Sequence, residues 1–178
     1  FLLGTFSAAF VLYGVALIFG ATGYTNLREI VMVVSNGSLL NTTLFLVGAA
    51  MLLVGFAFKT AVVPFHAWAP DVYQGAPSPV TGFMSIGAKA AGIAALLRVF
   101  MVAFPTLSAD LAPALGVLAA LTMLLGNLVA ISQQNIKRML GYSSIANGGY
   151  LLMAFVTFGK SEIVTETIAG MLFFLAAY

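Results

Sequence analysis

Long apolar runs alternate with short polar stretches along the 178 residues, and within each run the apolar positions are continuous. A helix needs about 17–25 mainly apolar residues to cross the hydrocarbon core of a bilayer. Six segments reach or approach that length: residues 1–20, 44–63, 80–104, 113–131, 139–158 and 163–178. Strands of a membrane β-barrel alternate apolar and polar residues, so continuous apolar runs exclude a barrel. Helices remain, because each helix satisfies its own backbone hydrogen-bonding groups within the bilayer. The pattern predicts an all-α, polytopic transmembrane helix bundle that forms one membrane domain over residues 1–178.

The second apolar segment does not continue as an ordinary helix. After Lys59 the chain reads TAVVPFHAWAPDVYQGAPSPV, in which Pro64 is the first of four prolines. Proline cannot donate a hydrogen bond to the carbonyl four residues earlier, here Thr60, and its ring crowds that turn. We expect the helix to be interrupted just after Lys59, within Lys59–Pro64, and a short second helix to run toward Gln74. Broken helices at membrane depth line cavities or ion sites in transporters, and a plain proline kink is the alternative.

Two lysines lie inside apolar segments, and the chain has no Asp or Glu at the same depth that could neutralise their charge. Lys59 ends the run that starts at Leu44, and Lys89 lies midway along residues 79–104. A lysine near the bilayer centre costs about 2.5–3.5 kcal/mol on insertion scales, so it is rarely there without a function. Burial lowers the pKa of a lysine and a nearby carboxylate raises it, so a lysine can relay protons where an arginine cannot. We interpret both as candidate proton-translocating residues on helices that pack side by side.

Other polar side chains could support a chain of water molecules beside these lysines. Ser85 precedes Lys89 by four residues, and His66 follows the expected break. A later apolar segment carries four more candidates: Ser143, Ser144, Asn147 and Tyr150. Hydrogen bonding between helices explains each serine, asparagine or tyrosine equally well when it is taken singly. His66 could likewise be a satisfied structural group.

The charged and aromatic residues near the ends of the segments have simpler expected roles. We expect Asp71 and Arg98 to be interfacial or capping charges, and Trp68 and Tyr73 to anchor the chain at the membrane interface. The basic residues do not orient the bundle, because three would lie on one side and two on the other. These are Arg28, Arg98 and Lys160 against Lys137 and Arg138.

Composition limits the function as well as the fold. Hydrophobic residues make up 62% of the chain and charged residues 7%, whereas a soluble domain carries about 25% charged residues. The formal charge of +2 comes from scattered residues, so nucleic acid is excluded as a partner. No cysteine is present, which excludes iron–sulfur ligation and thiolate metal sites. With one histidine and no nucleophile–base pair, we expect no metal site, cofactor site or redox chemistry on this chain.

Two stretches carry a family resemblance over nearly the whole chain. They are FKTAVVPFHAWAPDVYQGAPSPVTGFMSIGAKAAGIAALLRVF and GNLVAISQQNIKRMLGYSSIANGGYLL. Both closely resemble the proton-antiporter membrane subunit superfamily, and within it the antiporter-like subunit N of proton-pumping NADH:quinone oxidoreductase, respiratory complex I. Related subunits occur in multisubunit cation/proton antiporters and membrane-bound hydrogenases. Because Phe1 and Tyr178 both lie inside apolar runs, we expect a central fragment of such a subunit.

The resemblance implies a fold of two inverted helix repeats, each with a broken helix and a half-channel. It implies that Lys59 carries the proton of the first half-channel, that Lys89 passes protons toward the second, and that His66 follows the break. A glutamate that pairs with the first lysine would precede Phe1. It also places the QQNIKR turn and residues 68–79 on the negative side of the membrane. NADH, FMN, iron–sulfur clusters and quinone would all be bound by other subunits.

One position departs from the family pattern. Many relatives carry a histidine in the SSIANGGY motif where this chain has Asn147. Asparagine can hydrogen-bond a water molecule but cannot take up a proton near neutral pH. A relay at this position would therefore have to run through water.

Three hypotheses for the function remain at this point. The chain is a proton-translocating subunit that couples quinone reduction to pumping, or the equivalent subunit of a cation/proton antiporter or hydrogenase, or a scaffold that does not pump. Its partners would be other membrane-arm subunits and the lipid bilayer. We expect a multi-pass protein of the bacterial plasma membrane, with an organelle or thylakoid membrane as the alternative.

Overall fold

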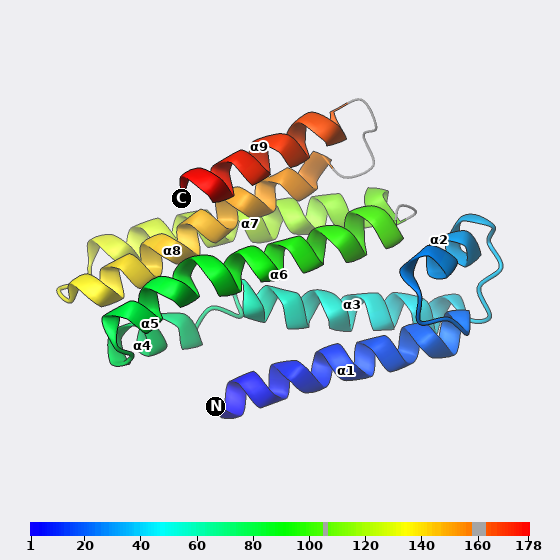
Figure 1. The fold of residues 1–178 in the computed structure, drawn as a ribbon, viewed down its shortest axis with the longest axis horizontal. Helices are drawn as coiled ribbons and strands as arrows, with labels where there is room; N and C mark the ends of the chain where they lie inside the picture. The colour runs from blue at the N-terminus through cyan, green and yellow to red at the C-terminus, as the bar shows by residue number, and fades with distance from the viewer. Residues whose placement is uncertain (105–106, 158–162) are drawn as a thin grey trace.

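The computed structural model describes residues 1–104, 107–157 and 163–178, and the described parts form an all-α bundle (Figure 1). The α-helices are α1 Leu2–Thr22, α2 Leu27–Ser35, α3 Thr42–Lys59, α4 Trp68–Gly75, α5 Ser78–Phe83, α6 Lys89–Leu96, α7 Ser108–Ile131, α8 Ile136–Met153 and α9 Val164–Ala177. Two π-helical stretches, η1 Met84–Ala88 and η2 Leu97–Ala103, continue α5 and α6 into one long rod, and the 3₁₀ turn η4 Ala154–Thr157 extends α8.

The long helices lie roughly along one direction (Figure 1). The most extensive pairings are α7 with α8 and α1 with α3, and the rod that contains α6 packs against α3. The half-helix α4 packs on α8 at the end of the bundle where the α7–α8 turn also lies, and α2 lies at the opposite end. Residues 68–79 and the QQNIKR turn therefore share one end, as the resemblance implied.

Four helical stretches are long and apolar enough to cross a membrane: Leu2–Thr22, Thr42–Lys59, Ser78–Met101 and Leu111–Ile131. The predicted segment at 139–158 forms α8, whose SSIANGG sequence makes it less apolar than these four. The segment at 163–178 forms α9, an apolar helix of 14 residues. The predicted spans therefore all appear as helices, although two of the six fall short of the length or apolarity of a full span.

The helix break is confirmed, and it begins just after Lys59 as predicted, so α3 ends four residues before the end of the approximate span 44–63. Helix α3 ends at Lys59, and α4 starts at Trp68. Ala61 adopts a left-handed conformation with φ 57° directly after the helix end. The backbone N–H of Val63 donates to Thr122 Oγ1 on α7 at 3.1 Å. The first part of the break, residues 60–63, is thus buried in protein, and one of its N–H groups has a partner on another helix.

One predicted connection is shorter than expected. The sequence indicated a link over residues 105–112, whereas α7 already begins at Ser108. Pro113 therefore lies inside the helix, where it removes one backbone hydrogen bond but does not end the helix. Residues 105–106 lie outside the described part of the chain.

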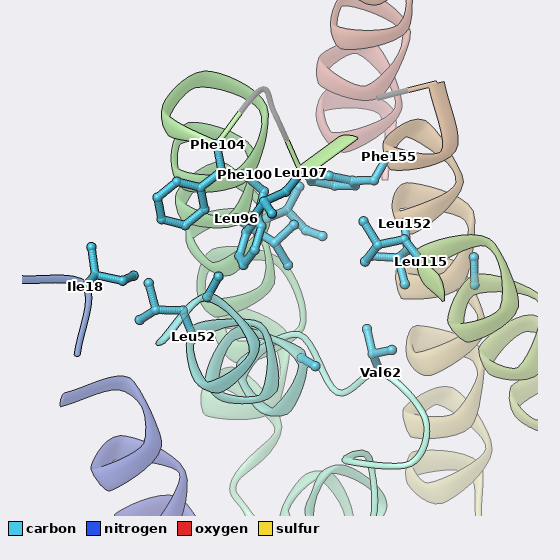
Figure 2. Close-up of a cluster of buried hydrophobic side chains, with 14 of the residues drawn as sticks. Ile18, Leu52, Val62, Leu96, Phe100, Phe104, Leu107, Leu115, Leu152 and Phe155 are labelled. Atoms are coloured by element: carbon cyan, nitrogen blue, oxygen red, sulfur yellow. The ribbon is translucent and has the colours of Figure 1, made fainter. Parts of the chain in front are cut away.

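The core joins the helix pairs near the end of the bundle opposite the break. Phe104 makes edge-to-face contacts with Phe45 and Phe100, with ring centroids 4.9 and 5.6 Å apart. Figure 2 shows Phe100 and Phe104 among aliphatic side chains from α1, α3, α6, α7 and α8, including Ile18, Leu52, Leu96, Leu115 and Leu152. Such dense contacts fix how α3 and α8 sit on either side of α6, and that arrangement positions the site described next.

Candidate functional site

Lys59 is the last residue of α3, and its side chain is exposed in the described part of the chain. It lines an open groove of about 750 Å³ together with Asp71, Trp68 and Met84. The other wall of this groove is formed by the first residues of α1, at positions 1–4. The expectation that Lys59 is buried is therefore not met within these residues, because it lies at a helix end that faces the groove.

Lys89 lies inside the bundle, as expected, with 4% of its surface exposed. Its Nζ donates to Ser144 Oγ at 2.6 Å and also to the carbonyl of Ser144. The ring of Tyr178 lies beneath the ammonium, with its centroid 5.9 Å from Nζ. A buried ammonium requires such acceptors, and here they come from α8 and not from a carboxylate.

Two glycines make room for this junction between α3, α6 and α8. A Cβ built on Gly148 would lie 3.3 Å from the Thr60 carbonyl oxygen and 3.7 Å from Lys89 Nζ. A Cβ built on Gly92 would lie 2.9 Å from Thr60 Cγ2 and 3.7 Å from Lys59 Cβ. Gly92 is one helical turn beyond Lys89 on α6. The stem of Lys59 therefore packs on α6 about one turn away from Lys89. The expected side-by-side packing of the two helices is confirmed.

A polar pocket of about 390 Å³ lies beside Ser144, between α4, α8 and the long rod that contains α5 and α6. It is lined by Tyr73, Ser78, Thr81, Gly82, Ser85, Lys137, Leu140, Ser143, Ser144 and Tyr178. Of the serines predicted for the path, Ser85, Ser143 and Ser144 thus line one space, and Ser144 joins that space to Lys89. The pocket extends from Ser144, which binds Lys89, toward Lys137 near the turn between α7 and α8.

The helix that carries Lys89 is π-helical directly before this residue. Residues Met84–Ala88 form η1, so Ser85 lies in the π-helical turn and Lys89 follows directly after it. A π-helical turn holds one residue more than an α-helical turn, so the four-residue spacing no longer keeps Ser85 and Lys89 strictly in line. Ser85 faces the pocket, where its hydroxyl donates to the Gly82 carbonyl at 2.8 Å. No local sequence pattern indicates this distortion.

The remaining predicted residues lie around the junction. His66 lies in the break, with Nδ1 buried and without a hydrogen-bond partner among the described residues. Asn147 donates from Nδ2 to the Ser143 carbonyl of its own helix at 2.9 Å. Tyr150 is 43% exposed and accepts from Asn127 Nδ2 on α7 at 3.3 Å. Asn147 and Tyr150 are not among the residues that line the polar pocket.

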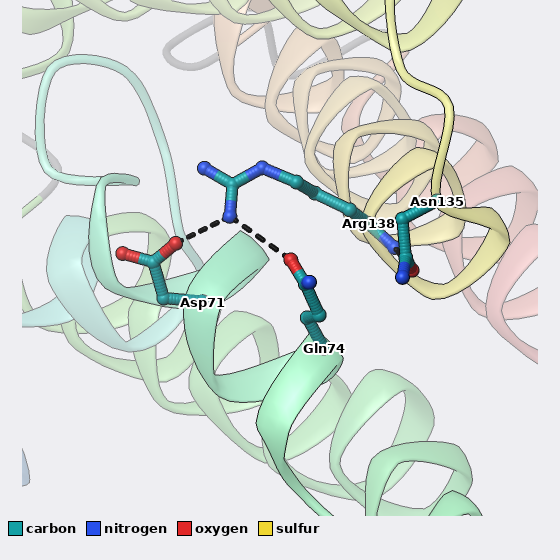
Figure 3. Close-up of polar contacts among 4 residues, drawn as sticks. All are labelled: Asp71, Gln74, Asn135 and Arg138. Carbon is teal, nitrogen blue, oxygen red and sulfur yellow. Dashed lines mark hydrogen bonds and ion pairs between the residues drawn. The ribbon is translucent and has the colours of Figure 1, made fainter.

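An ion pair ties α4 to the first turn of α8. Arg138 Nη1 donates to Asp71 Oδ1 at 2.5 Å and to Gln74 Oε1 at 3.2 Å (Figure 3). Asn135 Oδ1 accepts from the backbone N–H of Arg138 and so caps α8. Lys137 Nζ donates to the carbonyl of Ala76, just past the end of α4, at 3.0 Å. The role expected for Asp71, a charge at a helix end, agrees with its place in the first turn of α4.

Both expected interface anchors make contacts within the bundle. Tyr73 is 4% exposed, and its ring packs on Gly141 of α8. Trp68 stacks on Phe58 with centroids 5.5 Å apart, and its Nε1 donates to the Phe58 carbonyl at 2.9 Å. Both rings therefore hold α4 against its neighbours. Tyr73 is too buried to be an interface anchor, whereas that role for Trp68 stays a prediction.

Sequence reasoning also missed two residues that shape the junction. Thr60 is fully buried, and its hydroxyl donates to the carbonyls of Phe56 and Ala57 at the end of α3. Gly148 leaves the space that Lys89 Nζ approaches. The glycine pair in SSIANGGY was the available signal, since paired glycines in a membrane helix mark a close approach.

These features define a membrane-embedded helix bundle with a broken helix and a buried, hydrogen-bonded lysine beside a polar pocket. The described residues hold no group of three or more His, Asp or Glu side chains that could share a metal ion. The chain belongs to the NADH:quinone oxidoreductase/Mrp antiporter transmembrane family, which it matches over residues 1–178.

Several known proteins resemble this chain in sequence or in structure. It is 51% identical over 178 residues to NADH-quinone oxidoreductase subunit N of Trichlorobacter lovleyi, covering 100% of this chain and 36% of the relative. It resembles a chain of respiratory complex I from Thermus thermophilus with TM-score 0.72 and 44% identity, covering 98% of this chain and 38% of that one. It resembles a chain of the Mrp complex from a Dietzia species with TM-score 0.81 and 26% identity, covering 98% and 32%. The chain thus spans about a third of the length of these proteins.

Proposed function

We propose that this chain translocates protons as part of subunit N in the membrane arm of an NADH:quinone oxidoreductase. The observation that carries the proposal is Lys89, buried at 4% exposure and held by Ser144 beside a polar pocket. A lysine held by neutral acceptors can exchange its proton without leaving a buried carboxylate unpaired. The relatives named subunit N support the choice of complex.

Lys59 is the second proton-carrying residue in this proposal. It ends α3 at the break and faces the open groove, so it can meet a group that lies outside residues 1–178. Gly92 brings its stem against the same helix that carries Lys89. We propose that protons pass between Lys59 and Lys89 through water, with His66, Ser85, Ser143, Ser144, Asn147 and Tyr150 as candidate members of the path and Pro64 as the origin of the break.

Redox chemistry lies elsewhere in this proposal. NADH, FMN, iron–sulfur clusters and quinone would be bound by other subunits, and residues 1–178 would act as one membrane domain beside other membrane-arm subunits and lipid. The curated relatives are bacterial, which favours the bacterial plasma membrane as the location.

A second candidate is the corresponding subunit of a cation/proton antiporter. The similarity in fold to a chain of the Mrp complex supports it. The two functions differ in what drives transport, because an antiporter moves protons without quinone reduction. Co-purification of the full-length protein with quinone-reducing or with antiporter subunits separates them.

The test replaces the two lysines in the full-length protein within its complex. Lys59→Ala is expected to abolish pumping or reduce it strongly, and Lys89→Ala to reduce it partly or fully. Lys59→Arg is not expected to restore pumping, because arginine does not release its proton. The measurements are proton uptake and quinone-reductase activity in membrane vesicles, each normalised to complex content. Quinone reduction should fall together with pumping if the two are tightly coupled.

Arg28→Ala serves as the control, since Arg28 is an exposed basic residue of α2 at the other end of the bundle. It should pump at the wild-type rate. Wild-type pumping by Lys59→Ala and Lys89→Ala at normal complex content would leave the scaffold hypothesis standing and remove the proposed function.

A further inference from the structure

The half-helix α4 is attached to its neighbours at both ends. At its start Trp68 stacks on Phe58 and donates to the Phe58 carbonyl at 2.9 Å. At its end Lys137 Nζ donates to the carbonyl of Ala76 at 3.0 Å. Between these points the Tyr73 ring packs on Gly141 of α8. Because α4 is held from α3 and from α8, the groups on its surface have fixed positions relative to Lys59.

Asp71 lies on the part of α4 that faces the end of α3. It follows Trp68 by three residues, so it lies one helical turn further along the same face. Asp71 and Lys59 line the same groove, and Phe58, Val72 and other apolar residues form the rest of its wall. Their opposite charges attract each other across this open groove, where solvent weakens the attraction without removing it.

The ion pair to Arg138 fixes where this carboxylate lies (Figure 3). The Asp71 side chain is 70% exposed and that of Arg138 32% exposed. An exposed ion pair contributes little to stability, so holding the fold together does not explain this one well. The guanidinium contacts one oxygen of the carboxylate, Oδ1, and also Gln74 Oε1. The position of the negative charge is thus set from α8 while the same residue borders the Lys59 groove.

We propose that Asp71 is a positioning residue for Lys59. Arg138 holds the carboxylate on the wall of the groove, and the carboxylate draws the Lys59 ammonium toward the start of α4. The inference rests on the proposed function of Lys59 and adds a residue that was expected only to cap a helix. Asp71 acts through Lys59 and carries no proton itself.

The first test removes the charge and keeps the size, with Asp71→Asn in the full-length protein within its complex. The rate of proton uptake at equal complex content should fall about threefold or more, since one partly screened charge interaction is lost. Complex content should stay normal. Asp71→Glu should restore most of the uptake because it restores the carboxylate. Glu29→Gln, at an exposed carboxylate in the first turn of α2, is the matched control and should pump normally.

The second test exchanges the two charges in the double variant Asp71→Arg/Arg138→Asp. The exchange can rebuild an ion pair between α4 and α8 but places a positive charge beside Lys59. Pumping should therefore stay low. Full recovery in the exchanged variant would show that the pair is only a structural tie, and it would overturn the proposal.

If the exchanged variant does not assemble, the comparison of Asp71→Asn with Asp71→Glu decides alone. Equal pumping by these two variants refutes the role of the charge. Failure of the inference is also distinct from failure of the proposed function. Lys59→Ala would still lose pumping in the first case, and it would pump normally in the second.

Discussion

The ammonium of Lys89 depends on a single residue of a neighbouring helix. Ser144 supplies both the hydroxyl and the carbonyl that accept from Nζ, and Ser144 itself is 3% exposed. Hydrogen bonds to a charged group contribute about 1.5–3 kcal/mol, more than those between neutral groups. Ser144 is therefore the side chain through which the surroundings of Lys89 can be changed without removing the lysine.

Replacing Ser144 by alanine is expected to reduce proton uptake by about tenfold, because the loss of one charge-assisted hydrogen bond changes the energy of the charged lysine. The backbone carbonyl remains as an acceptor, so the variant should still assemble. Ser38→Ala is the control, since Ser38 is an exposed serine between α2 and α3 whose hydroxyl donates to the Val33 carbonyl. Proton uptake in vesicles measures the effect. Equal losses in the two variants would contradict a specific role for Ser144.

Ala61 shows strain at the break that can be tested separately. Its φ of 57° lies in the left-handed region that residues with a Cβ rarely adopt. Ala61→Gly removes the unfavourable Cβ contact and should stabilise the protein by about 0.5–1 kcal/mol after the greater backbone entropy of glycine is subtracted. Ala61→Val should destabilise it, since a β-branched residue fits this region worse. Thermal unfolding of the purified complex gives both values, and a more stable Ala61→Val variant would rule out the strain.

At the scale of helices, the sequence predicted what local chemistry determines. Pro64 predicted the break and continuous apolar runs predicted the spans, because both effects act within a few residues. The sequence also predicted that the helix is interrupted just after Lys59, but no propensity indicates the left-handed conformation of Ala61 at that point. A local pattern also cannot show that Trp68 folds back onto Phe58.

The candidate site was predicted in part for the same reason. The insertion energy of an unpaired lysine identified Lys59 and Lys89 without any structure. The acceptor of Lys89 lies 55 residues away, on α8, and only the packing of α6 on α8 brings it close. Lys59 and Lys89 looked equivalent in the sequence, yet one faces a groove and the other is buried. Burial is a property of the bundle and not of the segment.

The α7–α8 pair depends on a close approach of the two backbones. A Cβ on Gly126 of α7 would lie 2.7 Å from the backbone nitrogen of Ala146 on α8. Gly126→Ala should therefore push the helices apart and destabilise the protein by about 1–3 kcal/mol. Gly20→Ala on α1 is the matched control, because nothing lies within 4 Å of its Cβ position. Thermal unfolding of the complex checks the pair, and equal stabilities would show that α7 and α8 can separate without loss.

At the scale of the whole molecule, apolar surface covers the outer faces of the bundle. Large exposed side chains on α1 and α7 include Leu12, Tyr13, Val117, Leu124 and Leu128. A surface of this kind is stable against lipid or against other membrane helices and not against water. The same bundle has charged and polar residues at its ends, where α2, α4 and the α7–α8 turn lie. The ends of the bundle are thus the parts that can meet water.

The structure predicts which connections share a side of the membrane, although the basic residues do not orient the chain. Helix α3 separates the end that holds α2 from the end that holds α4 and the α7–α8 turn. The chain contains no cysteine, so single cysteines can be introduced at exposed positions without a background. In the full-length protein, Gly75→Cys and Gln134→Cys should react with a membrane-impermeant maleimide from one side, and Asn36→Cys from the other. Comparison of intact cells with inverted vesicles gives the side for each variant. If Asn36→Cys reacted from the same side as Gln134→Cys, α3 would not cross the membrane, and a path from the Lys59 break to the opposite side would have no helix to run along.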